Sequence, residues 1–135
     1  MTGWRVGYVA VHQVLVDEME KLMEHLVSGV SSAAQHPARV AIKGPQDCVA
    51  EMRMAYEERC AIVHPCLNEI EGISCLLPEW TFYAFANISR AGLNSWALAK
   101  CLVKEYRVAL LPGSIFGPKG EGYLRLSFAA SAESL

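Results

Sequence analysis

Two arginines stand in sequence surroundings that suit the binding of an anion. Arg5 lies in the opening segment MTGWRVGY, two residues from Gly3 and two from Gly7. Glycines at this spacing remove side chains from the strand face on which Arg5 would lie, which lets a bulky ligand approach the backbone closely. The planar guanidinium group suits an acceptor with two oxygens, such as a phosphate or a carboxylate. Arg5 is therefore a candidate anion-binding residue.

The second arginine, Arg125, lies in the middle of the segment GYLRLSFA, whose residues alternate between apolar and polar types. In a β-strand this alternation places Arg125 on one face with Tyr123 and Ser127, and three apolar side chains on the other face. A guanidinium group on a sheet face costs free energy unless an anion or a carboxylate meets it. A solvated strand face explains the pattern at least as well, so both interpretations stay open at this point.

Other residues with chemical potential are weaker candidates. Cys60 and His64 are one helical turn apart and Cys66 follows, but the chain has no paired CxxC motif, so we expect no metal site. The glycine-rich segment GPKGEG at 117–122 lacks the lysine-serine ending of a phosphate-binding loop and is expected to be a mobile turn. The four histidines lie in separate contexts without the spacing of a catalytic triad.

Composition excludes several classes of partner. The 135 residues carry 12 basic and 14 acidic side chains, and this balance provides no basic surface for nucleic acid or for an anionic membrane. No apolar run approaches the length of a membrane span, and the first residues lack the pattern of a secretory signal, so we expect a cytoplasmic protein. The five cysteines are expected to be free and largely buried thiols.

The elements that must position these residues alternate between strands and helices, which predicts an α/β fold. The pattern predicts a loosely alternating strand over 4–11, helices over 14–27 and 32–43, and a long helix over 49–70. Pro65 lies inside the long helix and should cause a kink or an early end near Val63. Two strands at 73–77 and 82–88 follow, then a helix over 95–106 and a strand over 108–111. GYLRLSFA is the last strand.

Four separated motifs give these predictions a family context: MTGWRVGY, GPQDCVAEMRMAYEERC, FYAFANIS and VALLPGSIFGPKGEGYLRLSFAAS. Together they closely resemble the C-terminal part of class I/II aminotransferases, the pyridoxal-phosphate-dependent enzymes of the aspartate aminotransferase fold (fold type I). The resemblance implies three parts. Residues 1–45 would be a remnant of the large, cofactor-binding domain with one strand and helices, 46–71 a bridging helix, and 72–135 a small α+β domain with a mainly antiparallel sheet.

The resemblance also implies roles for both arginines. Arg5 matches the family arginine that binds the phosphate of pyridoxal 5'-phosphate, and Arg125 matches the arginine that holds the substrate α-carboxylate. The implied activity is amino-group transfer from an amino acid to a 2-oxo acid, in a homodimer. The segment 108–114 would lead back to the mouth of the active site, and no role is assigned to Ser114 or Phe116.

The family's catalytic residue lies outside this sequence. The lysine that holds the cofactor as a Schiff base and moves the proton is expected four residues before Met1, so the chain contains no catalytic residue and is expected to be inactive alone. Its lysines match none of the family positions; they are Lys21, Lys43, Lys100, Lys104 and Lys119. Two local departures from the family are Trp80-Thr81, where a glycine usually precedes the strand, and Pro65 in the long helix.

Two alternatives to an aminotransferase remain open. One is another activity of the same fold, such as a carbon–sulfur lyase or a cyclopropane-forming synthase. The other is a non-catalytic remnant that serves as a binding or dimerising module.

Overall fold

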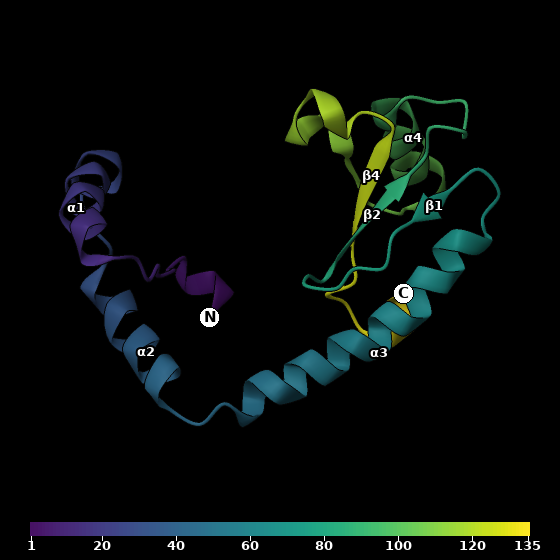
Figure 1. Ribbon diagram of the computed structural model, residues 1–135. Coiled ribbons are helices and arrows are strands. Elements are labelled where there is room, and N and C mark those ends of the chain that lie inside the picture. Colours follow the sequence, from purple (N-terminus) through teal and green to yellow (C-terminus); the bar gives the residue numbers. More distant parts are fainter. The chain divides into compact units, whose positions relative to one another are not determined.

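The structure, a computed structural model, describes the backbone of residues 1–135 and every side chain except that of Thr2 (Figure 1). The chain divides into two compact units, Met1–Cys48 and Val49–Leu135. The boundary falls in the first turn of the long helix α3, Asp47–Glu69.

The first unit contains a short 3-10 helix, Thr2–Trp4, and two α-helices, α1 (Gln13–Val27) and α2 (Ser32–Lys43). Both α-helices confirm the predictions. At the start of α1 the His12 ring accepts a hydrogen bond from the backbone N–H of Val14, which satisfies one of the free donors at a helix N-terminus.

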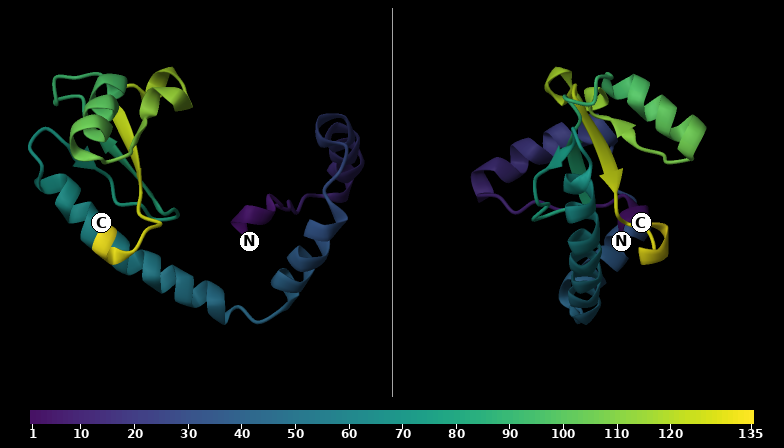
Figure 2. Two further views of the ribbon diagram at one scale, coloured as in Figure 1. Left: turned by 180° about the vertical axis from the view of Figure 1, so that it is seen from behind. Right: turned by 90° about the vertical axis from the view of Figure 1, so that its right-hand side faces the viewer.

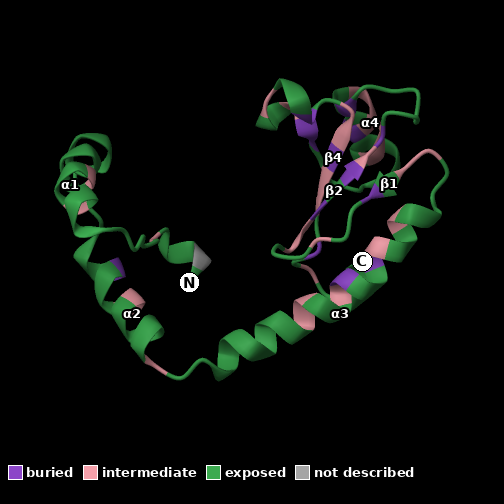
Figure 3. Ribbon diagram, in the orientation of Figure 1, coloured by how far each residue is buried: buried purple, intermediate pink, exposed green. Residues whose placement is uncertain are grey.

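The predicted strand over 4–11 is wrong. Residues 5–12 belong to no regular element, and none of the described residues of Met1–Cys48 forms a strand. A strand requires hydrogen-bonding partners on a neighbouring segment, and periodicity alone cannot provide them. Burial in this unit is slight, since Ala34 is the one residue described there as buried (Figure 3).

Helix α3 runs from Asp47 to Glu69 without ending at Pro65. Of the predicted kink or early end near Val63, the early end is therefore wrong. Proline removes one backbone donor and crowds the preceding turn. Packing on both sides of it offsets this cost, because Val63 is buried in the core before the proline and Leu67 packs against the same core after it. Tertiary contacts thus outweigh the local preference.

The second unit contains a four-stranded antiparallel sheet in the order β1-β2-β4-β3. Its strands are β1 (Ser74–Cys75), β2 (Tyr83–Asn87), β3 (Leu111–Pro112) and β4 (Tyr123–Ser127). The two central strands, β2 and β4, confirm the predictions. Strand β1 is shorter than the strand predicted over 73–77, and β3 begins at the residue where the strand predicted over 108–111 should end. In the register of β2 and β4, Phe85 lies opposite Arg125.

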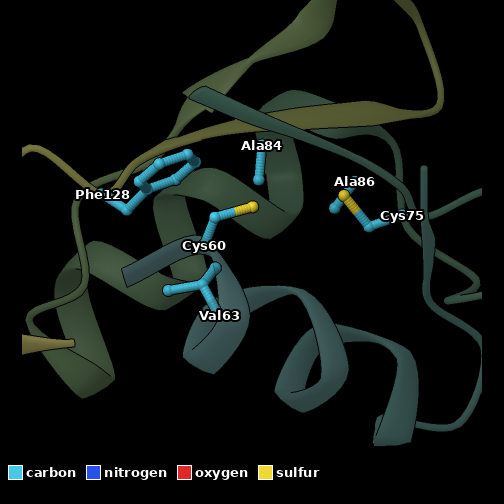
Figure 4. Packing of buried hydrophobic residues seen from close by; sticks show 6 residues of the cluster. All are labelled: Cys60, Val63, Cys75, Ala84, Ala86 and Phe128. Atoms are coloured by element: carbon cyan, nitrogen blue, oxygen red, sulfur yellow. The ribbon is translucent and has the colours of Figure 1, made fainter. Parts of the chain in front are cut away.

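Two helices cover one face of this sheet. Helix α4 (Ser95–Cys101) continues as a π-helix, Leu102–Tyr106, and together they span the predicted 95–106. Figure 2 shows α4 and α3 beside the sheet in two further views. The core where α3 meets the sheet is drawn in Figure 4, and it consists of Cys60, Val63, Cys75, Ala84, Ala86 and Phe128. Leu124 and Ala99 join β4 to α4 in a second cluster with Ile88.

Strand β1 is attached to α3 by side chains as well as by packing. The Asn68 side chain accepts a hydrogen bond from the Cys75 backbone N–H at 3.0 Å and donates one to the Cys75 carbonyl at 3.1 Å. His64 Nε2 lies 3.1 Å from the same carbonyl oxygen. The short strand β1 lies at the edge of the sheet and has no neighbouring strand on this side. The Asn68 amide takes the place of one, because it pairs with both the N–H and the carbonyl of Cys75.

The structure also places the five cysteines, all of which are free. Cys60 and Cys75 are buried and Cys101 is half-buried, but Cys48 and Cys66 are exposed, so the prediction of largely buried thiols is only partly right. As for the membrane, none of the described helices combines the length and the apolar character that a span requires.

Candidate functional site

Arg125 is half-buried on the sheet face that the helices do not cover. Its guanidinium carbon lies 4.2 Å from the ring centroid of Tyr83 and 4.7 Å from that of Phe116. Tyr83 is its diagonal neighbour on β2, because Tyr83 pairs with Ser127 and Phe85 with Arg125. Two aromatic rings from separate elements therefore contact the cation, and both attract it through their negative faces.

No carboxylate in the described part of the chain forms an ion pair with Arg125. The ion pairs described are Lys21–Glu18 and Arg53–Glu57, both on exposed surface. A guanidinium group that packs against aromatic rings still has N–H groups along its edge for a planar acceptor. The surroundings of Arg125 thus suit an anion with two oxygens that comes from outside the unit.

The neighbours predicted for Arg125 lie on the expected face, but other residues make the closest ring contacts. Tyr123 stacks on Phe85, with ring centroids 4.8 Å apart, and the Ser127 hydroxyl accepts a hydrogen bond from the backbone N–H of Ala129. Tyr83 is a neighbour that the alternation in GYLRLSFA does not predict, and Phe116 is one to which no role was assigned. Pairing FYAFANIS with GYLRLSFA in antiparallel register would have placed Tyr83 near Arg125.

The segment that carries Phe116 is a compact double turn, formed by the 3-10 helices Gly113–Phe116 and Pro118–Gly120. Gly113 and Gly120 approach each other so closely that a Cβ on Gly113 would lie 2.2 Å from the carbonyl oxygen of Gly120. Only glycine allows such a contact. The segment 117–122 that was expected to be a mobile turn is thus packed against the residues that carry Phe116.

A hydrogen-bond network joins this double turn to α4. The Glu121 carboxylate accepts hydrogen bonds from the backbone N–H and the hydroxyl of Ser95, at 2.8 and 2.7 Å, and the Ser95 and Ser114 hydroxyls are 3.0 Å apart. The two hydrogen bonds from Ser95, the one from its backbone first, lower the pKa of the Glu121 carboxyl. Ser95, the first residue of α4, is fully buried, so its position in the network is fixed by the surrounding core.

Arg5 belongs to the first unit, where it is exposed and follows the 3-10 helix. Its φ of 50° is left-handed, a conformation that also occurs at Ser28 after α1 and at Arg107 after the π-helix. Arg5 lines an open hollow of about 830 Å³ together with Trp4, Tyr8, Met19 and Met23. At Gly3 and Gly7 a Cβ would meet nothing within 4 Å, so space for a ligand is present beside the backbone.

The three residues that form the weak candidate for a metal site, two cysteines and a histidine, lie in three different surroundings. Cys60 is buried in the core, His64 faces the Cys75 carbonyl, and Cys66 is exposed. Within the described part of the chain, no three histidine, cysteine or acidic side chains are grouped so that they could hold a metal ion.

The sheet and its helices form an α/β structure of the aminotransferase type. A crystal structure of aromatic aminotransferase from Pyrococcus horikoshii OT3 is similar over 98% of this chain and 36% of that chain, with a TM-score of 0.85 and 38% sequence identity. Among curated proteins, aspartate aminotransferase of Pyrococcus horikoshii is 38% identical over 137 residues. Aspartate/prephenate aminotransferase of Nitrosomonas europaea is 39% identical over 146 residues.

The family model described as aminotransferase class I and II matches residues 1–135, and the chain belongs to this family. Both curated relatives align with all of the chain, which spans 35% and 36% of their respective lengths. The chain therefore corresponds to about a third of an aminotransferase.

Proposed function

We propose that this chain is part of a pyridoxal-phosphate-dependent amino-acid aminotransferase, in which Arg125 binds the α-carboxylate of the substrate. The observation that carries the proposal is the setting of Arg125, which is half-buried, contacts two rings and has no carboxylate partner among the described residues. A bidentate guanidinium–carboxylate pair is geometrically specific. It suits every amino acid and 2-oxo acid, because all of them share the carboxylate.

The residues of this chain fit one end of the cofactor. We propose that Arg5 binds the phosphate, because it is a guanidinium beside an open hollow with free space at Gly3 and Gly7. The described lining of this hollow contains no lysine, so the residues present fit the phosphate end and not the Schiff-base end. When bound, pyridoxal phosphate supplies the electron sink for amino-group transfer.

The related proteins differ in the substrates that their names state. Those names include aspartate, aspartate/prephenate and aromatic-amino-acid aminotransferase. We therefore propose amino acids and 2-oxo acids as the substrate class. The choice of side chain would depend on residues beyond the shared carboxylate site.

We further propose that the 135-residue chain does not transfer amino groups alone. Incubation of the purified chain with pyridoxal phosphate, aspartate and 2-oxoglutarate should produce no glutamate above a protein-free control. Glutamate formation that depends on the chain would contradict this expectation.

A chimera tests the roles of the arginines. The chain replaces the matching segment of the Pyrococcus horikoshii aspartate aminotransferase, to which it is 38% identical. The chimera should transfer amino groups, and Arg125→Gln should lower kcat/KM at least about 30-fold, because the partner of a desolvated carboxylate is lost. Arg5→Gln should weaken cofactor binding instead. A folded, active chimera in which Arg125→Gln leaves kcat/KM unchanged would refute the proposed carboxylate site.

A further inference from the structure

The two rings that contact Arg125 are themselves held in place. The Phe116 ring meets Phe85 on the same sheet face in an edge arrangement, with centroids 6.2 Å apart, and the Phe85 ring is in turn stacked on Tyr123. Tyr83 contacts the Phe82 ring, with centroids 4.4 Å apart. Neither Tyr83 nor Phe116 therefore depends on Arg125 alone for its position.

Phe116 also depends on the double turn. The Gly113–Gly120 contact and the Glu121–Ser95–Ser114 network fix the residues before and after it. Phe116 is nevertheless 52% exposed, so it contributes little to the core. Because the Phe116 ring is exposed, stands on a rigidly held turn and lies over the Arg125 guanidinium group, its position is better explained by contact with this cation than by packing in the core.

Arginine has many rotamers, and fixing one of them costs conformational entropy each time a ligand binds. A cation–π contact reduces this cost in advance, because the guanidinium group already has a preferred orientation in the absence of the ligand. Bidentate binding of a carboxylate requires such an orientation, since both N–H groups must meet both oxygens at once.

We infer that Tyr83 and Phe116 form an aromatic clamp, defined as these two rings, that positions the guanidinium group of Arg125 for a carboxylate. They are positioning residues, and they act through Arg125. The inference rests on the proposed role of Arg125 as the carboxylate-binding residue. It goes further by assigning a binding contribution to two residues that need not touch the ligand.

The test uses the full chain labelled with ¹⁵N and acetate as the probe. The Nε–Hε resonance of Arg125 is assigned by its loss in Arg125→Lys and is followed during titration with sodium acetate at constant ionic strength. Arg59 is the internal reference, because it is also half-buried but, among the described residues, contacts only the ring of Tyr56, at 5.3 Å. Acetate should shift the Arg125 resonance with saturation and should leave that of Arg59 nearly unchanged.

The clamp is tested with two pairs of variants. Phe116→Leu and Tyr83→Leu remove a ring and should each weaken acetate binding about two- to fivefold, the range that corresponds to an exposed cation–π contact. Phe116→Tyr and Tyr83→Phe retain the ring and should bind acetate as the unchanged chain does. The backbone resonances of β2 and β4 report whether each variant keeps the sheet.

The possible failures can be told apart. If acetate shifts Arg125 no more than Arg59 in the unchanged chain, the proposed carboxylate site itself is refuted. If acetate binds at Arg125 but both leucine variants bind it equally well, the site stands and the clamp is refuted. If Phe116→Leu disturbs the sheet, Tyr83→Leu and the two ring-retaining variants still decide the question.

Discussion

Glu121 accepts hydrogen bonds from both donors of a single residue, Ser95: one carboxylate oxygen is 2.8 Å from the Ser95 backbone N–H and the other is 2.7 Å from its hydroxyl. Ser95 is the first residue of α4, where backbone N–H groups have no partner within the helix. Glu121 thus supplies a cap from 26 residues along the chain. This contact attaches the double turn, and with it Phe116, to α4.

The Glu121 cap should make stability depend on pH. Its hydrogen bonds lower the pKa of the folded carboxyl, so the ionised form stabilises the fold above the unfolded value of about 4.3, and this contribution is lost as the pH falls through the folded pKa. Glu121→Gln should therefore be less stable at pH 7 and should lose less stability between pH 7 and 3. Urea denaturation across this range measures both quantities.

The control for this measurement is Glu133→Gln. Glu133 is exposed, and its side chain has no hydrogen bond or ion pair among those described. Its substitution should leave the pH dependence close to that of the unchanged chain. A stability difference between Glu121→Gln and the unchanged chain that stayed constant from pH 7 to 3 would argue against an ionised cap.

The double turn should be intolerant of side chains at its two buried glycines. In Gly113→Ala the new Cβ would lie 2.2 Å from a carbonyl oxygen, and in Gly120→Ala 2.0 Å from one, so the backbone must move. Each substitution should lower the free energy of unfolding by about 2 kcal/mol. Gly7→Ala is the matched control, because a Cβ there meets nothing within 4 Å. Equal midpoints of urea unfolding for all three variants would contradict the close contact.

The helices could be predicted from the sequence because their signals are local. Apolar spacing defined α1 and α3 to within a few residues, and Gly44-Pro45 marked the end of α2. The strands depended on distant partners. The segment 4–11 alternates like a strand but pairs with no described segment, whereas β1 and β3 are short pairings on the edges of a sheet whose centre was predicted well.

The candidate site likewise has one feature that local sequence predicts and others that depend on distant residues. The alternation in β4 correctly placed Arg125 opposite the core face, since Leu124 and Phe128 are buried. Its contacts with Tyr83 and Phe116 could not be read from that strand alone. They depend on the register with β2 and on the path of the double turn, and both of these follow from packing between residues far apart in the sequence.

Asn68 should control the order of β1. Its side chain bonds to both the N–H and the carbonyl of Cys75, in a strand of only two residues. Asn68→Ala removes both bonds and should cost about 2 kcal/mol of stability. Hydrogen exchange of the Cys75 amide should then accelerate at least about tenfold, because β1 can open locally without first breaking the two hydrogen bonds to Asn68.

Asn68→Asp is a graded control for this effect. An aspartate retains the acceptor for the Cys75 N–H but has no donor for the Cys75 carbonyl. Its exchange rate should lie between those of the unchanged chain and Asn68→Ala. Equal Cys75 exchange in the unchanged chain and in Asn68→Ala would show that the sheet, and not the side chain, protects this amide.

The thiols provide a test of how α3 packs on the sheet. Cys60 and Cys66 lie on the same helix, but Cys60 is buried against Ala84 and Val63 in the core whereas Cys66 is exposed. Burial raises the pKa of the Cys60 thiol, and burial is also the main cause of the raised pKa of Cys75. Since the thiolate is the reactive form, inaccessibility and a raised pKa act in the same direction.

Iodoacetamide at pH 8 should therefore modify Cys48 and Cys66 at least about tenfold faster than Cys60 and Cys75, with half-buried Cys101 between them. Mass spectrometry of peptides taken at timed intervals measures each site. In urea all five rates should converge, because the difference arises from folding and not from neighbouring sequence. Rapid modification of Cys60 without urea would mean that α3 separates readily from the sheet, and the core that supports the Arg125 face would then be open in solution.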